Sequence, residues 1–376
     1  MLPMMLLSAA LAGGADPAVL LDPAQPYTGE TSAAVAYKVE FKAVVTAPQG
    51  TRKLRVWVPV PPSDAAQEVT DGEWDVFPTA VKPTFHVEPV FGNRFAHFEF
   101  ADPQGAQVIG HSFRATVRQM DWAVTEANVT AVTAWPKAFD PYRRSEAAIL
   151  LDDRIRDLAA GVATGKDGGG AKLSAVMDWT AKTMTYDHTA TSLVASTAHA
   201  LDKKRGDCSD YHGLCSSFGR ALGVPTRLAY GLHLFPKNLP SHCKLEAYLP
   251  PHGWVSFDVS ETQRLVGLIE ADQSLSAEKK TELTKAATDR LRRGFRDNTW
   301  LKHSTGTDYE LAPKASRKVP LVSTIHAEAD GMPLPTPDPA DKTKREFAWM
   351  TAHKYETDRP VPYPFRDWRT LAAKPK

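Results

Sequence analysis

The period of the hydrophobic pattern changes close to residue 136 of this chain. Before this point apolar and polar residues alternate, as in the stretches 35–41 and 113–117. Alternation with a period of two is typical of β-strands that are buried on one face. Pro, Gly and Asp separate these stretches, as in an antiparallel β-sandwich. We therefore expect an antiparallel β-sandwich domain over residues 31–135.

Beyond residue 136 the apolar residues recur at helical spacing. This pattern predicts three helices, over 147–161, 173–184 and 207–223. Period-two stretches follow them and predict three strands, at 226–234, 242–249 and 254–259. Helices that precede antiparallel strands indicate an α+β domain, which we expect over residues 136–268.

The C-terminal part of the chain begins with a predicted charged helix. Ser276 is a candidate N-cap, Glu278 lies in the first turn, and Gly294 stands where a C-cap glycine is expected. The charges of this helix are typical of a face exposed to water. Beyond Ala329 many prolines indicate a linker or a meandering arm. We therefore expect a helical and Pro-rich extension over residues 269–376.

The composition is that of a globular protein with enough apolar material for a core. Hydrophobic residues make up 43% and charged residues 24% of the chain, which excludes a wholly disordered chain and a collagen-like fibre. The 45 basic and 44 acidic residues nearly cancel, so the charge does not favour a nucleic-acid partner. Three cysteines cannot form a disulfide framework. They therefore require a chemical explanation.

The first residues have features of a secretion signal. Residues 1–12 are apolar, and Ala10-Leu11-Ala12 has the small-x-small form of a signal-peptidase site, although no basic residue precedes the apolar run. The run is too short to span a bilayer, which needs about 20 apolar residues. We expect a signal peptide and linker over residues 1–30, no integral membrane span, and a periplasmic or secreted location.

One cysteine has the sequence context of a nucleophile. Cys208 falls in the first turn of the predicted helix over 207–223, and Asp207 is a candidate cap for that helix. Unpaired N–H groups and the helix dipole stabilise a thiolate at such a position. A catalytic cysteine also needs a nearby imidazole that can act as a base.

His242 and Asp258 are the candidate partners of this cysteine. His242 begins one predicted strand, and the turn at 250–253 returns the chain through a second strand to Asp258. Because a short hairpin makes the two strands antiparallel neighbours, we expect Asp258 to approach His242. In this arrangement Cys208 attacks, His242 takes its proton, and Asp258 orients the imidazole and stabilises its cation.

The other cysteines have simpler interpretations. Cys215 shares a helical face with apolar residues, and Cys243 alternates with His242 along its strand, so we expect both in the core. Cys208, His212 and Cys215 lack the closely spaced cysteine pair of most structural zinc sites. We therefore predict no metal site.

Three further residues lie close in sequence to these candidates. Asp210 either tunes the helix that begins at Asp207 or is an acid exposed to solvent, and we expect the latter. Glu246 shares a strand face with His242 and either contacts the site or is exposed. Trp254 is expected in the core.

Four segments follow one another along the chain: Gly-Asp-Cys-Ser-Asp-Tyr-His, Arg-Ala-Leu-Gly-Val-Pro-Thr-Arg, the strand from His242, and Gly-Trp-Val-Ser-Phe-Asp. In this order they resemble the transglutaminase-like superfamily of papain-like cysteine enzymes. The resemblance implies a papain-like core with a central antiparallel sheet. It also implies that Cys208, His242 and Asp258 are nucleophile, base and orienting acid. Lys244 departs from the family, whose strand more usually has an aromatic or apolar residue there.

The resemblance implies acyl transfer from an amide through a thioester on Cys208. The acceptor is water in peptidases and amidases, and an amine in true transglutaminases. We expect hydrolysis of peptide or amide bonds in a peptide or protein substrate, without a cofactor. A protein-glutamine γ-glutamyltransferase and a non-catalytic binding scaffold are the alternatives. The backbone N–H of Cys208 is expected to stabilise the oxyanion, and Tyr186 is a candidate second donor.

Overall fold

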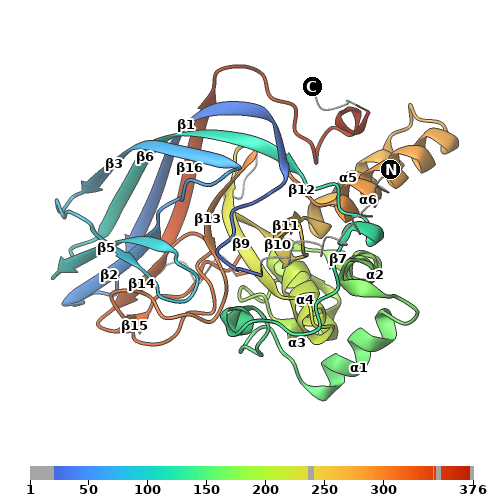
Figure 1. Ribbon diagram of the computed structural model, residues 1–376. Coiled ribbons are helices and arrows are strands. Elements are labelled where there is room, and N and C mark those ends of the chain that lie inside the picture. Colours follow the sequence, from blue (N-terminus) through green and yellow to red (C-terminus); the bar gives the residue numbers. More distant parts are fainter. Residues whose placement is uncertain (1–20, 236–240, 342, 344–348, 373–376) are drawn as a thin grey trace, which may run out of the picture.

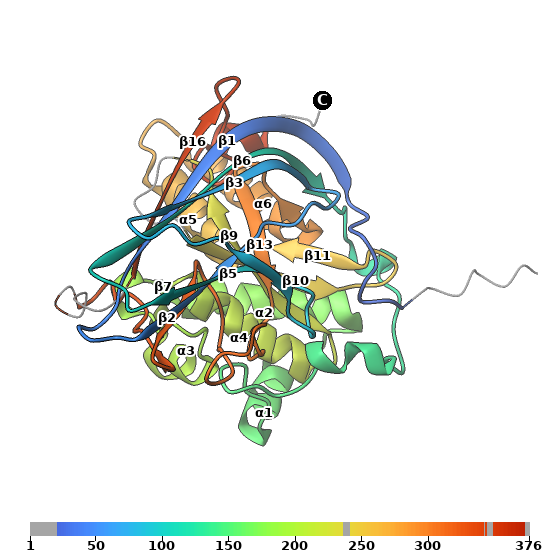
Figure 2. The same ribbon diagram turned by 90° about the vertical axis from the view of Figure 1, so that its left-hand side faces the viewer.

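The computed structural model describes residues 21–235, 241–341, 343 and 349–372. The predicted signal segment at residues 1–12 lies outside this part of the chain. A β-sandwich and a group of helices occupy opposite ends of the molecule, with a smaller sheet between them (Figures 1 and 2). Within the described ranges, no helix is long and apolar enough to cross a membrane.

Two antiparallel five-stranded sheets form the sandwich. The first has the order β12–β6–β1–β16 with β3 paired to β6, and its strands are β1 (Glu30–Thr46), β3 (Gln67–Phe77), β6 (Ala106–Asp121), β12 (Phe295–Arg296) and β16 (Trp349–Thr357). The second has the order β15–β14–β2–β5–β4, and its strands are β2 (Lys53–Pro59), β4 (Thr84–Val87), β5 (Arg94–Ala101), β14 (His326–Ala329) and β15 (Met332–Pro333).

The alternating pattern of β1 explains why the two sheets pack together. Phe41, Ala43 and Val45 point to one face of the strand and are buried, whereas Lys42 between them is exposed. The buried side chains form a core with residues of the second sheet such as Val56. The predicted antiparallel β-sandwich is therefore confirmed.

The C-terminal segment contributes strands to both sheets of the sandwich. β16 pairs with β1 over nine residues, from Trp349 opposite Val45 to Thr357 opposite Tyr37. The expectation of a linker or arm beyond Ala329 is therefore wrong for residues 349–357. Burial alternates along this stretch, since Trp349 is buried and Met350 is exposed. The prolines upstream of the stretch favoured the expectation of a linker instead.

A four-stranded antiparallel sheet forms the centre of the α+β part. Its order is β11–β10–β9–β13, and its strands are β9 (Thr226–His233), β10 (Ser241–Tyr248), β11 (Trp254–Phe257) and β13 (Trp300–Thr305). The helices of this part are α1 (Asp153–Val162), α2 (Gly168–Thr183), α3 (Thr197–Lys203), α4 (Cys208–Ala221), α5 (Val259–Ala271) and α6 (Ala277–Arg293). The predicted α+β class with a central antiparallel sheet is confirmed.

Helix α4 is the central helix of this part of the molecule. Its residues from Cys208 to Arg220 are all buried, because it packs against β9 and β10 on one side and against α1, α2 and α3 on others. The remaining short elements are the parallel pair β7 (Thr185–Tyr186) and β8 (Arg205–Gly206) and the 3-10 turns η1 (Glu126–Asn128), η2 (Lys137–Tyr142), η3 (His188–Ala190) and η4 (Trp368–Leu371).

Helix α1 begins six residues later than its apolar spacing predicts. The Asp152 side chain accepts a hydrogen bond of 2.8 Å from the backbone N–H of Ile155 and caps the helix there. Upstream, the carbonyl of Ala148 accepts from the N–H of Thr197 at 2.9 Å, which is not a helical bond. The buried residues before Asp152 therefore pack without forming a helix.

The sandwich and the α+β part share a hydrophobic contact. Leu234 and Leu301 from the central-sheet region pack with Val39 and Phe113 of the sandwich. β12, which follows α6, also joins the sandwich by pairing with β6. The sandwich is thereby fixed next to the edge of the central sheet.

Candidate active site

The start of α4 is held by a reciprocal pair of caps. The Asp207 side chain accepts hydrogen bonds from the N–H groups of Ser209 at 2.8 Å and Asp210 at 3.4 Å. The Asp210 side chain accepts in return from the N–H of Asp207 at 3.3 Å. Gly206 is required before this turn, because a Cβ there would lie 2.4 Å from an oxygen of Asp210. Cys208 is thus the first helical residue.

The environment of Asp210 differs from the exposed acid expected. Its side chain is buried and accepts hydrogen bonds from both the backbone N–H, at 3.0 Å, and the hydroxyl of Ser192. This carboxylate therefore ties the loop before α3 to the first turn of α4. Burial raises the pKa of Asp210, and burial with the nearby charge of Cys208 raises that of Asp207 to about 8.

The β10–β11 hairpin brings His242 and Asp258 together. Leu245 pairs with Phe257 in this hairpin, so the end of β11 lies beside the middle of β10, and Asp258 continues toward the start of β10. The Nε2 atom of His242 lies 2.7 Å from Oδ2 of Asp258. The other oxygen, Oδ1, accepts from the N–H of Glu261 at 3.0 Å and caps α5. Asp258 is therefore fixed by both the hairpin and the helix that follows it.

Lys244 adds a buried cation to this pair. Its Nζ atom lies 2.6 Å from Oδ2 of Asp258 and 2.9 Å from Oδ2 of Asp297. All three side chains are buried. From the sequence, Lys244 is a departure from the family with no assigned partner, and Asp297 has no expected role at the site. The signal in the sequence was a lysine within a predicted core strand, because a buried lysine needs carboxylate partners.

The charges around Cys208 favour a thiolate. Cys208 is 7% exposed, and its pKa lies well below the usual value because of a hydrogen-bonding interaction with the Cys243 thiol and the charge of His242, which outweigh burial. Burial lowers the pKa of His242, but Asp258 and Cys208 together raise it to about 9. A thiolate–imidazolium pair is the form that these interactions stabilise.

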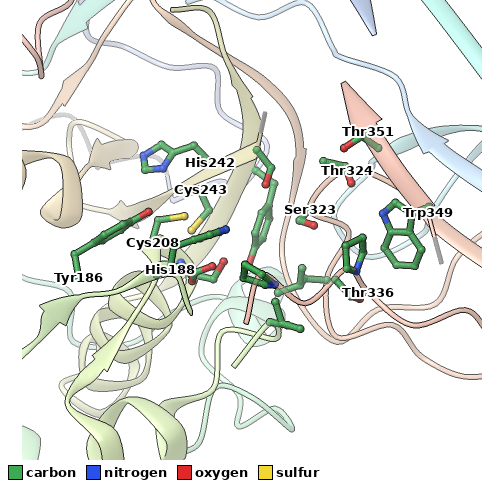
Figure 3. A pocket seen from close by; sticks show the side chains of 18 residues that line it. Tyr186, His188, Cys208, His242, Cys243, Ser323, Thr324, Thr336, Trp349 and Thr351 are labelled. Carbon is green, nitrogen blue, oxygen red and sulfur yellow. Dashed lines mark hydrogen bonds between the residues drawn. The ribbon is translucent and has the colours of Figure 1, made fainter. Parts of the chain in front are cut away.

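Cys208 and His242 line one cleft with a volume of about 180 Å³. Tyr186 and Cys243 lie in the same wall as these two residues, and the Tyr186 hydroxyl points toward Cys208 (Figure 3). The opposite wall comes from the C-terminal segment and consists of Leu321, Ser323, Thr324, Thr336, Pro337, Pro339, Trp349 and Thr351. Two distant parts of the sequence therefore build the cleft.

Residues 156–259 match the family model of the transglutaminase-like superfamily. The chain carries a transglutaminase-like core. The matched range contains Cys208, His242 and Asp258, together with α4, β9, β10 and β11. A search of curated proteins found no match.

The transglutaminase-like core and the sandwich together resemble one solved structure over nearly the whole chain. This is "a Putative Cysteine Protease from Cytophaga hutchinsonii", with a TM-score of 0.59, 16% identity, and coverage of 91% of this chain and 97% of that chain. At this identity the likeness shows a shared fold.

Two further structures match shorter parts. A "putative protease" from Parabacteroides distasonis has a TM-score of 0.26 and 11% identity over 56% of this chain and 42% of that chain. A structure described as a TGase has a TM-score of 0.24 and 14% identity over 47% of this chain and 45% of that chain. These scores are too low to support an argument about this chain.

Two tyrosines of the transglutaminase-like core face the cleft. Tyr186 was a candidate from the sequence, whereas Tyr230, on β9 opposite Cys243, was missed because nothing in its local sequence marks it. Burial and the nearby charge of Cys208 raise the pKa of both hydroxyls. Both therefore remain protonated and can donate a hydrogen bond into the cleft.

The other two cysteines, Cys215 and Cys243, have different surroundings. Cys215 packs in the main hydrophobic core, as expected, and its thiol donates to the hydroxyl of Thr180 at 3.3 Å. Burial raises its pKa to about 12. Cys243 is also part of that core, but it lines the cleft as well and lies beside Cys208 (Figure 3).

A different set of side chains has the spacing of metal ligands. Among the described residues, His233, His242 and Glu261 bring potential ligand atoms within 4.8 Å of one another. Cys208, His212 and Cys215 do not belong to this cluster. Within this cluster, Nε2 of His242 is already hydrogen-bonded to Asp258.

Glu246 and Trp254 lie away from the cleft. The carboxylate of Glu246 is buried and accepts from the Tyr27 hydroxyl at 2.5 Å and from Nε of Arg227 at 2.7 Å. The Arg227 guanidinium also stacks 4.0 Å from the ring centroid of Trp254, which is in the core as expected. Glu246 thus joins the N-terminal segment to the central sheet.

Proposed function

We propose that the chain is a cysteine-dependent amide acyl-transfer enzyme that hydrolyses peptide or amide bonds through a thioester on Cys208. The observation that carries this proposal is the 2.7 Å contact between His242 and Asp258 beside a cysteine at the head of a helix. The match to the transglutaminase-like superfamily and the fold shared with the Cytophaga structure support a cysteine-based enzyme.

The first half of the reaction forms the thioester. The Cys208 thiolate attacks the carbonyl carbon of the substrate amide, and the carbonyl electrons move to its oxygen. When the tetrahedral intermediate collapses, the C–N bond breaks and the imidazolium of His242 gives its Nδ1 proton to the leaving nitrogen. Asp258 keeps the opposite ring nitrogen, Nε2, hydrogen-bonded throughout.

The second half releases the acid. The now neutral His242 takes a proton from a water molecule, whose oxygen attacks the thioester carbon. The C–S bond then breaks, the carboxylic acid leaves, and the Cys208 thiolate and the His242 imidazolium are restored. Each proton taken is returned within one cycle, so no other reactant is required.

The oxyanion of both intermediates requires donors. The backbone N–H of Cys208 at the start of α4 is one proposed donor, because the first N–H groups of a helix have no partner within it. The hydroxyls of Tyr186 and Tyr230 are the proposed candidates for the second donor, since both line the cleft with Cys208.

The apolar start of the sequence supports the further proposal of a periplasmic or secreted enzyme. N-terminal sequencing of protein recovered outside the cytoplasm tests it. A new N-terminus shortly after Ala12 is expected, whereas recovery of protein that begins at Met1 would contradict it.

The main proposal is tested with a thiol-directed activity probe and a peptide library. Wild-type protein should be labelled at Cys208 and should cleave members of the library, and Cys208→Ala should do neither. Cys215→Ala is the matched control, because this thiol is buried in the core, and it should retain activity. Absence of cleavage by folded wild-type protein would favour a binding scaffold.

A second assay separates hydrolysis from crosslinking. The protein is incubated with a glutamine peptide and a labelled primary amine in water. Hydrolysis predicts release of ammonia without incorporation of the label. Incorporation that exceeds hydrolysis would instead favour the γ-glutamyltransferase activity, which uses the same thioester on Cys208.

A further inference from the structure

Cys243 is the second thiol of the cleft. It follows His242 on β10, is buried, and its sulfur lies beside that of Cys208 (Figure 3). On its other side, Sγ of Cys243 lies 3.5 Å from Nδ1 of His212, which is one turn into α4. Cys243 therefore bridges the first residue of α4 and an imidazole of the same helix.

The proton position on His212 follows from its other neighbour. Its Nε2 atom accepts a hydrogen bond of 3.1 Å from the backbone N–H of Val259. Because a backbone N–H can only donate, Nε2 has no proton. Burial lowers the pKa of His212 to about 4, so the ring is neutral and its single proton is on Nδ1. Nδ1–H therefore donates to the sulfur of Cys243.

This bond fixes the role of the Cys243 thiol. Its sulfur acts as the acceptor for His212, which leaves its own S–H hydrogen available for Cys208. Burial and the neighbouring Cys208 raise the pKa of Cys243 well above the usual value, so Cys243 stays a protonated donor. Each group in this chain donates to the next: Val259 to His212, His212 to Cys243, and Cys243 to Cys208.

We propose that Cys243 is an auxiliary thiol that stabilises the Cys208 thiolate by donating its S–H hydrogen bond, with His212 as the positioning residue. The inference rests on the proposed function in that Cys208 is the nucleophile. No proton leaves Cys243 in this role. The donor stabilises the resting thiolate, and it stabilises the same thiolate again when the C–S bond of the thioester breaks.

Several titratable groups face Cys208 and must be considered together. They are Asp207 and His212 on or next to α4, Tyr186 on β7, Tyr230 on β9, and His242 and Cys243 on β10. His242 supplies the charge that favours the thiolate. The experiment must therefore change the Cys243 donor while His242 and Asp207 remain in place.

The test measures the rate of iodoacetamide alkylation of Cys208 against pH, read by mass spectrometry of the peptide that contains it. Cys243→Ala should move the midpoint of the Cys208 profile upward by about one pH unit, which is about tenfold less thiolate on the acid side. Cys243→Ser keeps a hydroxyl donor and should restore most of the shift. Cys215→Ala is the matched control and should leave the midpoint unchanged.

His212→Phe is a second variant, which removes the positioning bond but leaves the Cys243 thiol in place. It should also raise the midpoint, by less than Cys243→Ala. Equal midpoints in wild type, Cys243→Ala and His212→Phe would overturn the proposal. Because alkylation requires no substrate, a shifted midpoint in a protein without turnover would support the thiol donor and contradict only the proposed hydrolysis.

Discussion

Lys244 and His242 donate to the same oxygen of Asp258, at 2.6 Å and 2.7 Å. Two cationic or proton-donating groups thus converge on one buried carboxylate. Burial raises the pKa of Asp258, but Lys244 and then His242 lower it well below the usual value. Asp258 is therefore ionised while it accepts the hydrogen bond from His242. Lys244 also contacts a second carboxylate, that of Asp297.

This relationship predicts a large loss of stability in Lys244→Met. The variant leaves Asp258 and Asp297 buried without their shared cation, which costs about 3–5 kcal/mol of unfolding free energy. Urea denaturation measures the change. Lys285→Met is the matched control, because the Lys285–Asp289 pair is exposed on α6, and it should cost less than about 1 kcal/mol. Equal small losses in both variants would contradict the importance of the buried cation.

Asp258→Asn should reduce kcat/KM by roughly 10³–10⁴-fold, since an amide neither stabilises the imidazolium of His242 nor fixes its tautomer. The peptide assay described above provides the measurement. Glu246→Gln changes another buried carboxylate, which lies outside the cleft on Tyr27 and Arg227. It should lower stability but leave kcat/KM of the folded protein within about twofold. A similar loss of activity in both variants would argue against the orienting role.

Activity should depend on pH through the thiolate–imidazolium pair. The pKa of Cys208 is lowered and that of His242 is raised to about 9. The pair is therefore present at neutral pH, is lost in acid when Cys208 is protonated, and is lost as pH rises through about 9 when His242 loses its proton. A profile of kcat/KM against pH should be bell-shaped.

The basic limb of that profile has a second candidate group, because the pKa of Asp207 is raised to about 8. Asp207→Asn removes this group and should leave the limb near pH 9. If the basic limb disappears in Asp207→Asn, that limb reports the titration of Asp207 instead.

The raised pKa of His242 also affects the stability of the folded protein. It adds stability below the unfolded pKa of 6.5, and this contribution disappears as pH rises through about 9.

Neighbouring residues of β16 should respond differently to truncation. Trp349 is buried between the sheets and also lines the cleft, whereas Met350 is exposed on the same strand. Trp349→Ala should cost about 3–5 kcal/mol, and Met350→Ala should change stability by less than about 0.5 kcal/mol. Thermal unfolding measures both changes. If the two costs are alike, the pairing of β16 with β1 is not in this register.

The sequence predicted the elements whose signals are local. The alternation in β1, the cap at Asp207 and the turn between β10 and β11 each depend on residues close together in the chain. These signals were sufficient for the β-sandwich, the α+β core and the approach of Asp258 to His242. The hairpin alone brings that pair together, because its turn joins the two strands directly.

Tertiary packing decided the contacts between residues that are distant in sequence. Lys244 meets Asp297 across 53 positions, and Cys243 meets His212 across 31. The pairing of β16 with β1 joins residues 349–357 to residues 37–45. Local periodicity determines which face of an element is apolar, so it could not show which buried polar groups meet across elements. Those meetings follow from how the sheets and helices pack, because a buried charge or donor is stable only where packing supplies its partner.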